Sequence, residues 1–378
     1  MIMKVPLFQI FWDEEDLNAV RSTIMKGCSW ANGPKVKDFE EKIAEYIGAD
    51  HCVVFNSATS ALHASLLACD IGIGDEVVVP SFSFIATANA PVFTGAKPVF
   101  ADIERKRMGL DPAAVTAAIT RKTKAIIPVH YGGCPCRIAE LREIADENAL
   151  ILIEDAAEAM GATIGGRKVG TFGDMAVLSF CQNKIISTGE GGAIVTDSKE
   201  TWRKLRLIRS HGRDEMEDHF TTGKFQDYIS IGYNFRMSDI TASLGISQIS
   251  KIEKLISMRR TAADSYLSRL SKCDGIEPLI TPKDSLNVYQ LLSVLVEEGK
   301  QARDKLILNL QRAGVSSKVY FYPIHLTQFY RRTFGYKEGV LPVTESVSNS
   351  ILSLPIYPTI QDGDINYVVE MMMQAIEH

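Results

Sequence analysis

Apolar and β-branched residues form short unbroken runs along the first two thirds of the chain, and segments with helical patterning separate these runs. Unbroken apolar runs are typical of strands that are covered on both faces, whereas half-exposed strands alternate. The runs predict seven strands, at residues 51–55, 76–80, 98–101, 125–130, 150–153, 175–180 and 193–196. With helical segments between them, such as 60–69 and 138–146, they predict an α/β fold with a mostly parallel central sheet flanked by helices.

The pattern changes near residue 240, where residues 239–256 read as one long amphipathic helix that could connect two domains. The elements predicted after it are strands at 288–296 and 317–322, a helix at 302–314 that ends in glycine, and a closing helix at 365–376. We therefore expect a large domain over residues 1–247 and a smaller C-terminal α+β domain over residues 248–378.

Composition excludes several function classes. The chain has 378 residues, of which 46% are hydrophobic and 23% charged, so it can build a large core. Its formal net charge is −5 and its basic residues are scattered, which argues against nucleic-acid binding. The first residues lack the pattern of a signal peptide, and no stretch reaches the roughly 18 apolar residues of a membrane span. We expect a cytoplasmic protein without a membrane partner.

The cysteines indicate reduced thiols and no metal site. There are seven of them, an odd number at irregular spacing, which is typical of a reducing compartment. Cys134 and Cys136 are separated by a single residue, closer than the usual zinc or redox spacing, and no His/Cys cluster accompanies them. We therefore expect no bound metal.

Lys184 and Asp155 are the most informative residues, because each follows or ends a predicted buried strand. Desolvating a lysine costs free energy, so a lysine just past a buried strand calls for a reason. One interpretation is an enzyme that uses pyridoxal phosphate (PLP), in which the lysine amine forms a Schiff base and the carboxylate pairs with the pyridinium nitrogen. The alternative is a structural Asp–Lys ion pair, or a lysine that extends to the surface.

Three other segments could complete such a site. Residues 56–62 follow the first strand and open a helix, so Ser57 and Thr59 could bind a phosphate or merely cap the helix. Phe84 could stack on a pyridine ring or belong to the core. Glu158, one helical turn after Asp155, could reach the cofactor or substrate, or be a first-turn acid favoured by the helix dipole.

Two segments later in the chain are open to a similar choice. The polar and aromatic run 232–239 could belong to the site or be a helix start capped at Ser238 or Asp239. His325 ends a predicted strand and could contact a substrate, although a lone histidine is more often structural.

Taken together, these segments resemble the PLP-dependent sugar aminotransferases of the DegT/DnrJ/StrS family, which have the aspartate-aminotransferase-like fold (fold type I). The resemblance extends over almost the whole chain. It rests on residues 30–34, 56–62, 74–84, 95–100, 123–130, 153–161, 169–174, 179–192 and 232–237.

The resemblance implies a role for each matching residue. Lys184 matches the Schiff-base lysine, Asp155 the acid on the ring nitrogen, and Glu158 the residue near the ring hydroxyl. The residues expected to bind the phosphate are Ser57, Ala58, Thr59, Ser179 and, from the other subunit of a homodimer, Asn234. The remaining expectations are Phe84 stacking on the cofactor, and Trp30 and His325 at the substrate.

The resemblance also implies the reaction: transfer of an amino group from an amino acid, expected to be L-glutamate, to a nucleotide-linked keto sugar in polysaccharide, lipopolysaccharide or glycan biosynthesis. Related sugar dehydratases carry histidine in place of the lysine, so Lys184 favours transamination. The run 187–192 is similar to that of members acting on 4-keto-6-deoxy sugars rather than 3-keto sugars. The alternative is a regulatory member that binds PLP or a sugar nucleotide without catalysis.

Overall fold

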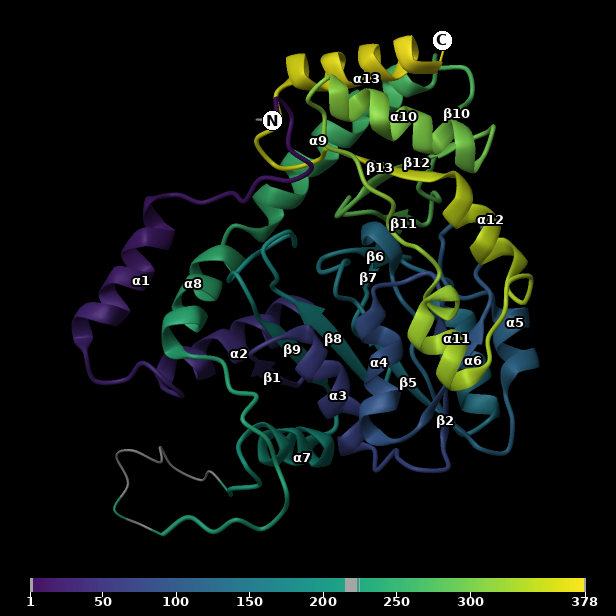
Figure 1. Ribbon diagram of the computed structural model, residues 1–378. Helices are drawn as coiled ribbons and strands as arrows, with labels where there is room; N and C mark the ends of the chain where they lie inside the picture. Colours follow the sequence, from purple (N-terminus) through teal and green to yellow (C-terminus); the bar gives the residue numbers. More distant parts are fainter. Residues whose placement is uncertain (1–2, 215–222, 224, 377–378) are drawn as a thin grey trace.

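A seven-stranded sheet forms the centre of the N-terminal part of the fold (Figure 1). The computed structural model describes residues 3–214, 223 and 225–376. The strand order is β1-β9-β8-β5-β4-β2-β3, and all neighbours are parallel except β9, which runs antiparallel to β1 and β8. The strands are β1 (His51–Phe55), β2 (Glu76–Pro80), β3 (Lys97–Ala101), β4 (Thr123–Ile126), β5 (Ile151–Asp155), β8 (Met175–Ser179) and β9 (Gly192–Thr196). The predicted fold class is confirmed, and these strands overlap the seven predicted runs.

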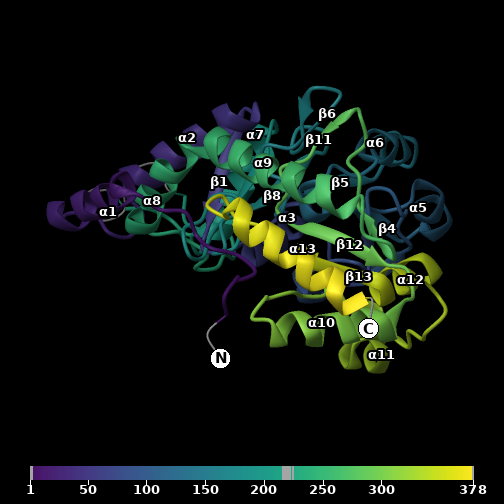
Figure 2. The ribbon, with the colours of Figure 1, turned by 90° about the horizontal axis from the view of Figure 1, so that it is seen from above.

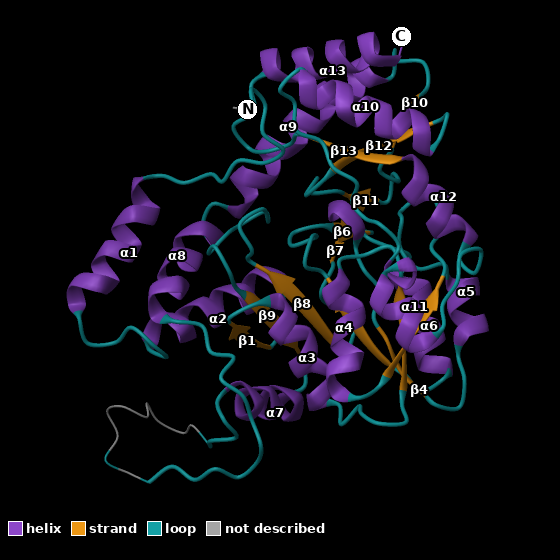
Figure 3. Cartoon of the chain, viewed as in Figure 1, coloured by secondary structure: helices purple, strands orange, loops and turns teal. Residues whose placement is uncertain are grey.

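Helices cover both faces of this sheet (Figure 3). The helices on one face are α2 (Pro34–Ile47), α5 (Pro112–Ala118), α6 (Ile138–Glu147) and α8 (Asp239–Ile249). Those on the other face are α3 (Ala58–Ala68), α4 (Ile85–Thr94) and α7 (Lys199–Arg209). Because both faces are covered, β8 and β9 are buried at every position, as their unbroken apolar runs predicted.

The C-terminal part packs its helices on a small antiparallel sheet of order β10-β12-β13 (Figure 2). The strands are β10 (Ile276–Pro278), β12 (Leu292–Val296) and β13 (Ile351–Leu354), and the helices are α10 (Lys300–Arg312), α12 (Pro342–Ser350) and α13 (Asp362–Ile376). Helix α11 (Gln328–Phe334) instead packs through Tyr330 in a core cluster of the central sheet. A second small sheet joins the hairpin β6 (Thr163–Ile164) and β7 (Arg167–Lys168) to β11 (Ser285–Leu286). No helix in the described part of the chain has both the length and the apolar character that crossing a membrane requires.

The predicted long helix at 239–256 is wrong in one respect, because the chain breaks after α8 and restarts as α9 (Ile252–Leu270). At the break, Lys251 turns its amine to Asp16 of α1 (Glu14–Lys26), with an Nζ–Oδ1 distance of 2.9 Å. The first turns of α9 pack in the large core and its later turns in the small one, so α9 does connect the two parts.

The predicted strand at 317–322 is also wrong. Only Lys318 forms a bridge, to Ser353, and the rest is a loop. The Tyr320 carbonyl accepts its hydrogen bond from the Tyr131 hydroxyl at 2.6 Å instead of from a neighbouring strand. This hydrogen bond joins the loop to Tyr131, which follows β4 along the chain.

Candidate active site

The carboxyl ends of the parallel strands place most of the predicted residues along one edge of the sheet. Asp155 ends β5 and Ser179 ends β8, while Ser57 is separated from the end of β1 by Asn56 alone. Gly192, the first residue of β9, pairs with both Phe55 and Ser179. Ser179 therefore lies across β9 from the start of α3.

The start of α3 and Gly192 are in close contact. A Cβ atom added to Gly192 would lie 2.5 Å from the Ala58 nitrogen and 2.7 Å from its Cα. Ser57 caps the helix, and its Oγ accepts a hydrogen bond from the Ser60 nitrogen at 3.1 Å. Ser57 therefore caps the helix, and the remaining backbone amides of the first turn, including that of Thr59, lie at a helix N-terminus, a position suited to bind an anion.

We expect Gly192→Ala to weaken PLP binding at least about tenfold, because the new methyl group collides with backbone rather than with a movable side chain. The dissociation constant can be measured by fluorescence titration of the apoprotein. Gly363→Ala is the matched control, since a Cβ at Gly363 meets nothing within 4 Å and needs no left-handed backbone. Equal affinities in the two variants would show that this contact does not shape the cofactor site.

Asp155 is buried within a set of hydrogen bonds that fixes both carboxylate oxygens. Oδ2 accepts from the Thr87 hydroxyl at 2.8 Å, and Oδ1 accepts from the Ala157 amide at 3.2 Å. Burial raises the pKa of Asp155, and the Thr87 bond, the Ala157 bond and the charge of Lys184 only partly offset this. A buried carboxylate held in this way is suited to hold a proton at a cationic ring nitrogen.

The Lys184 amine reaches into the same region. Its Nζ lies 3.3 Å from Glu158 Oε1, and Glu158 Oε2 accepts from the Gly132 amide at 2.9 Å. Lys184 thus forms an ion pair within the fold, as the alternative interpretation expected, but its partner is Glu158 rather than Asp155. Both side chains are largely buried.

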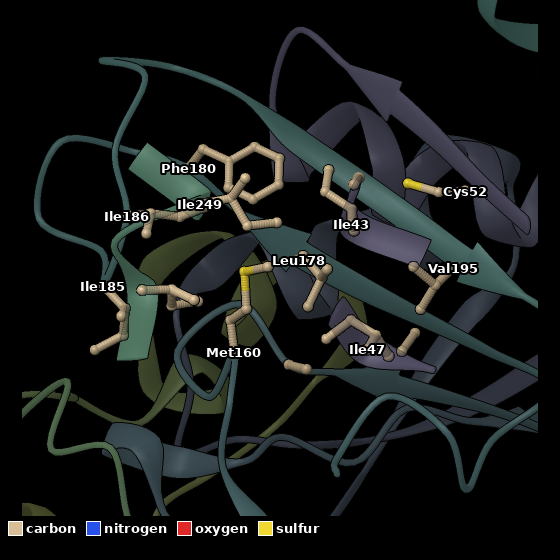
Figure 4. Close-up of a cluster of buried hydrophobic side chains, with 14 of the residues drawn as sticks. Ile43, Ile47, Cys52, Met160, Leu178, Phe180, Ile185, Ile186, Val195 and Ile249 are labelled. Carbon is tan, nitrogen blue, oxygen red and sulfur yellow. The ribbon is translucent and has the colours of Figure 1, made fainter. Parts of the chain in front are cut away.

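A hydrophobic cluster supports the Lys184 loop from below. Phe180, Ile185 and Ile186 are buried and pack with residues of β8, α2 and α8 (Figure 4). Full burial of each such side chain contributes about 1.5–3 kcal/mol. The residues on both sides of Lys184 are therefore held by core packing, while its own side chain extends to Glu158.

Phe84 and Trp30 are both exposed, and each is free to contact a ligand on one side. Phe84 is 60% exposed at the start of α4, one turn before Thr87, and its ring lies near Phe321. Trp30 is 51% exposed in the turn between α1 and α2. It precedes all the other predicted site residues in the sequence. Asn234 is exposed too, and its backbone pairs with Ser210.

His325 does not lie where we expected it. Its side chain is fully buried, with Nδ1 2.7 Å from Ser81 Oγ and Nε2 3.1 Å from Glu345 Oε1. Burial lowers its pKa, so the ring is neutral at physiological pH. Both ring nitrogens have partners within the fold, so the structure does not support the predicted substrate contact, and we assign His325 a structural role.

Sequence reasoning missed the partners that hold the site in place, namely Thr87, Gly132 and Glu154. Glu154 Oε1 accepts from the amides of Phe172 and Gly173, both at 2.7 Å, and so fixes the loop before β8. An acid in an otherwise apolar strand was a signal for such a residue, but nothing in the sequence named its partners.

The residues fit PLP. A reactive amine, a buried carboxylate, an anion site at a helix start and an exposed aromatic ring are the groups that hold this cofactor. Most of these groups are located at or next to strand ends and helix starts, which are regular elements of the fold.

Comparisons with known proteins agree. The DegT/DnrJ/EryC1/StrS aminotransferase family matches residues 11–373. GDP-perosamine synthase of Caulobacter vibrioides is 35% identical, with 91% of each chain covered, and the spore coat polysaccharide biosynthesis protein SpsC of Bacillus subtilis is 34% identical, with 96% of this chain and 95% of that protein covered. The PLP form of the putative sugar aminotransferase Spr1654 from Streptococcus pneumoniae is 26% identical and superposes with a TM-score of 0.93 over 99% and 98% of the two chains. The chain belongs to the DegT/DnrJ/EryC1/StrS aminotransferase family, and its cofactor is PLP.

Proposed function

We propose that this aminotransferase moves an amino group from L-glutamate to a nucleotide-linked 4-keto-6-deoxy sugar in polysaccharide or glycan biosynthesis. The observation that carries the proposal is the convergence of Lys184, Glu158 and Asp155 at one edge of the sheet. The names of the relatives, a GDP-perosamine synthase and a spore coat polysaccharide biosynthesis protein, support a nucleotide-linked sugar as acceptor.

In this proposal each of these residues has a separate role. Lys184 would hold the cofactor through its amine and, when released, would take a proton from the donor carbon and give one to the sugar carbon. Asp155 holds a proton at the ring nitrogen, and Glu158 positions the lysine through their 3.3 Å contact. When bound, PLP supplies an electron sink for the negative charge that develops at the substrate carbon.

The other residues bind and orient. Phosphate would be bound by Ser57, Ala58, Thr59 and Ser179. Gly192 lies close to Ser57 and Ala58 and pairs with Ser179. Phe84 would cover one face of the pyridine ring, and Trp30 would contact the sugar nucleotide. The positive end of the α3 dipole adds to this phosphate site.

The test is a panel of UDP-, GDP- and dTDP-linked keto sugars, each incubated with glutamate and analysed by mass spectrometry. The proposal expects an amino-sugar product from a 4-keto-6-deoxy member of the panel. Loss of the visible absorbance of the PLP-loaded protein on adding glutamate would separate an aminotransferase from a regulatory protein. If glutamate changes the spectrum and only 3-keto sugars give product, the assignment of the sugar is wrong.

We also propose that the active protein is a homodimer in which Asn234 of one subunit completes the phosphate site of the other. The support is exposed apolar surface, since Phe225 is 87% and Ile231 89% exposed in the segment before Asn234. Leu17 and Met25 of the projecting helix α1 are exposed as well (Figure 1). Apolar surface of this kind is typical of a protein interface.

A mixing experiment tests the shared site. Lys184→Ala and Asn234→Asp chains, each nearly inactive alone, are refolded together. If sites are shared, each heterodimer has one site with both changes and one with neither, so activity rises well above the mean of the parents. Activity equal to that mean, or an active monomer in sedimentation, would contradict the proposal.

A further inference from the structure

Gln290 connects the segment that leads into β12 to the backbone beside Lys184. It belongs to residues 287–291, which join β11 to β12, and it is 3% exposed. Its Nε2 donates to the carbonyl of Asn183 at 2.5 Å, although the two residues are 107 positions apart in the sequence. Asn183 directly precedes Lys184, so this bond holds the backbone at the residue before the lysine.

The side chain of Gln290 uses only half of its hydrogen-bonding capacity. Oε1 is buried and has no hydrogen-bond partner among the residues that the structure describes. A buried acceptor without a partner destabilises a fold, and an apolar side chain of similar size would avoid this cost. The bond to Asn183 therefore explains an amide at this position better than stability does.

The same segment also contacts the turn that holds Glu158. Two amides of segment 287–291 donate to two carbonyls of the turn at 3.2 and 3.1 Å, in the pairs Val288–Gly133 and Leu291–Gly132. The amide of Gly132 in turn donates to Glu158 Oε2 at 2.9 Å. The segment is therefore bonded both to the backbone before Lys184 and to the backbone that holds the partner of its amine.

The segment and this turn are in direct backbone contact. Gly133 has a φ of +97°, and a Cβ atom added there would lie 2.9 Å from the Gln290 nitrogen and 2.8 Å from Val288 Cγ2. No side chain fits between the two backbones. The position of Gln290 relative to the turn is thus fixed by packing, and the bond to Asn183 starts from a well-defined place.

A second buried glutamine holds the other end of the loop that carries Lys184. Gln248 of α8 accepts from the Ser187 amide through Oε1 at 3.4 Å, and its Nε2 donates to the Phe11 carbonyl and to Asp16 Oδ2 at 3.2 and 2.9 Å. Both ends of this amide have partners, so a structural role accounts for Gln248. Gln290 differs, because among the described residues its side chain bonds only to the residue before the lysine.

We propose that Gln290 is a positioning residue for amino transfer, and that through Asn183 it sets the place of the Lys184 amine relative to Glu158 and the cofactor. The inference rests on the role proposed for Lys184. Position matters because a displacement of about 1 Å at a reacting group can lower a rate roughly 10²-fold. Gln290 itself touches neither the cofactor nor the substrate in this proposal.

Gln290→Met tests the bond to Asn183, because methionine has a similar length and lacks both the donor and the acceptor. Hydrogen exchange of the apoprotein gives the first measurement. The Lys184 amide donates to the Cys181 carbonyl at 2.9 Å, and it should exchange about tenfold faster in the variant. Exchange at the wild-type rate would overturn the proposal.

Reconstitution with PLP gives the second measurement. The Lys184 amine condenses with the aldehyde of added PLP and releases one water, which can be followed by visible absorbance. We expect this step to be about 10–100-fold slower in Gln290→Met. Affinity for 4′-deoxypyridoxine phosphate, which has no aldehyde, should stay unchanged, since the phosphate site is not altered. Equal rates in the variant and the wild type, or an equal loss of affinity for the analogue, would contradict a role in positioning the lysine.

Ser353→Ala is the matched control. Ser353 is fully buried in β13, and its Oγ lies 2.8 Å from Ser293 Oγ. Both variants lose one buried hydrogen bond, so both should have a lower melting temperature, while only Gln290→Met should react more slowly with PLP. Slower reaction in both would mean that the rate reports general stability, and would overturn the assignment to Gln290.

Gln290→Glu keeps the proposal testable if Gln290→Met does not fold. Glutamate keeps the shape and one oxygen of the side chain, but its carboxylate cannot donate to the Asn183 carbonyl. The Lys184 amide should therefore exchange faster in this apoprotein as well, and this measurement reports the backbone rather than the added charge. Exchange at the wild-type rate would show that the donor of Gln290 is not needed.

Borohydride reduction and mass spectrometry separate this inference from the proposed role of Lys184. If the cofactor of the wild type is attached to another residue, the role of Lys184 is wrong and the inference is overturned with it. If it is attached at Lys184, and Gln290→Met reacts at the wild-type rate, only the inference fails. With a keto sugar that the enzyme accepts, Gln290→Met should lower kcat about 10–100-fold and leave KM for the sugar unchanged.

Discussion

Lys184→Ala is expected to abolish amino transfer, with a loss of at least about 10⁴-fold in kcat, while the fold survives. In the proposed mechanism this residue supplies both the amine that attaches the cofactor and the base that moves the proton, so no other group can replace it. Its amine pairs with Glu158, and the loop beneath it is held by Ile185 and Ile186 rather than by the lysine side chain. The free energy of unfolding should therefore fall by no more than about 1–3 kcal/mol, the cost of leaving Glu158 partly unpaired.

Three measurements check this prediction. Turnover is followed with the preferred keto sugar, folding by circular dichroism, and covalent attachment by mass spectrometry after reduction with borohydride, which should add the cofactor mass to the wild type only. Lys168→Ala is the matched control, because Lys168 is also a partly buried lysine, packed on the Tyr46 ring away from the strand ends. Substantial transamination by Lys184→Ala would refute the assignment of the lysine.

The central sheet could be predicted because each of its strands can be recognised from its own residues. Strands buried on both faces need unbroken apolar runs, and the acid or lysine that follows such a run stands out. Since parallel strands end at one edge, the positions of Asp155 and Lys184 in the sequence were enough to expect that they lie close together. The family resemblance, now confirmed, is also the source of the proposed roles of residues such as Ser57 and Ser179, whose local pattern also fits an ordinary helix cap or strand end.

Contacts between distant segments could not be predicted in this way. Thr87 is 68 residues from Asp155 in sequence, and Gly132 is 26 residues from Glu158. His325 ends a stretch with strand-like residues, but Ser81 and Glu345 from elsewhere in the chain enclose its ring. At the break between α8 and α9, Lys251 likewise binds a residue of another element, Asp16 of α1. In each case the deciding partner comes from another element, and single-sequence periodicity contains no information about it.

Asp155→Asn is expected to lower kcat by about 10²–10³-fold and yet to make the apoprotein more stable at neutral pH. The loss of rate follows because the amide cannot hold a proton at the ring nitrogen by its charge. The fold should tolerate the change, since Asn can accept from the Ala157 amide and donate to Thr87, whose hydroxyl can then donate to Ser83. An unchanged rate would mean that Asp155 does not face the ring nitrogen.

The gain in stability follows from the raised pKa of Asp155 in the folded apoprotein. As the pH rises, the carboxyl of the unfolded chain loses its proton first, so the wild type loses stability between the unfolded and the folded pKa and does not regain it above them. The asparagine side chain does not titrate, so the variant does not lose stability over this pH range for this reason. The free energy of unfolding can be measured with urea for both apoproteins from about pH 4 to 8. The variant should have the larger value at neutral pH, and its advantage should decrease as the pH falls toward the ordinary carboxyl pKa. A variant that is less stable at neutral pH would show that Asp155 stabilises the fold. A variant that is slower but more stable would show that the buried carboxylate serves the reaction at the expense of stability.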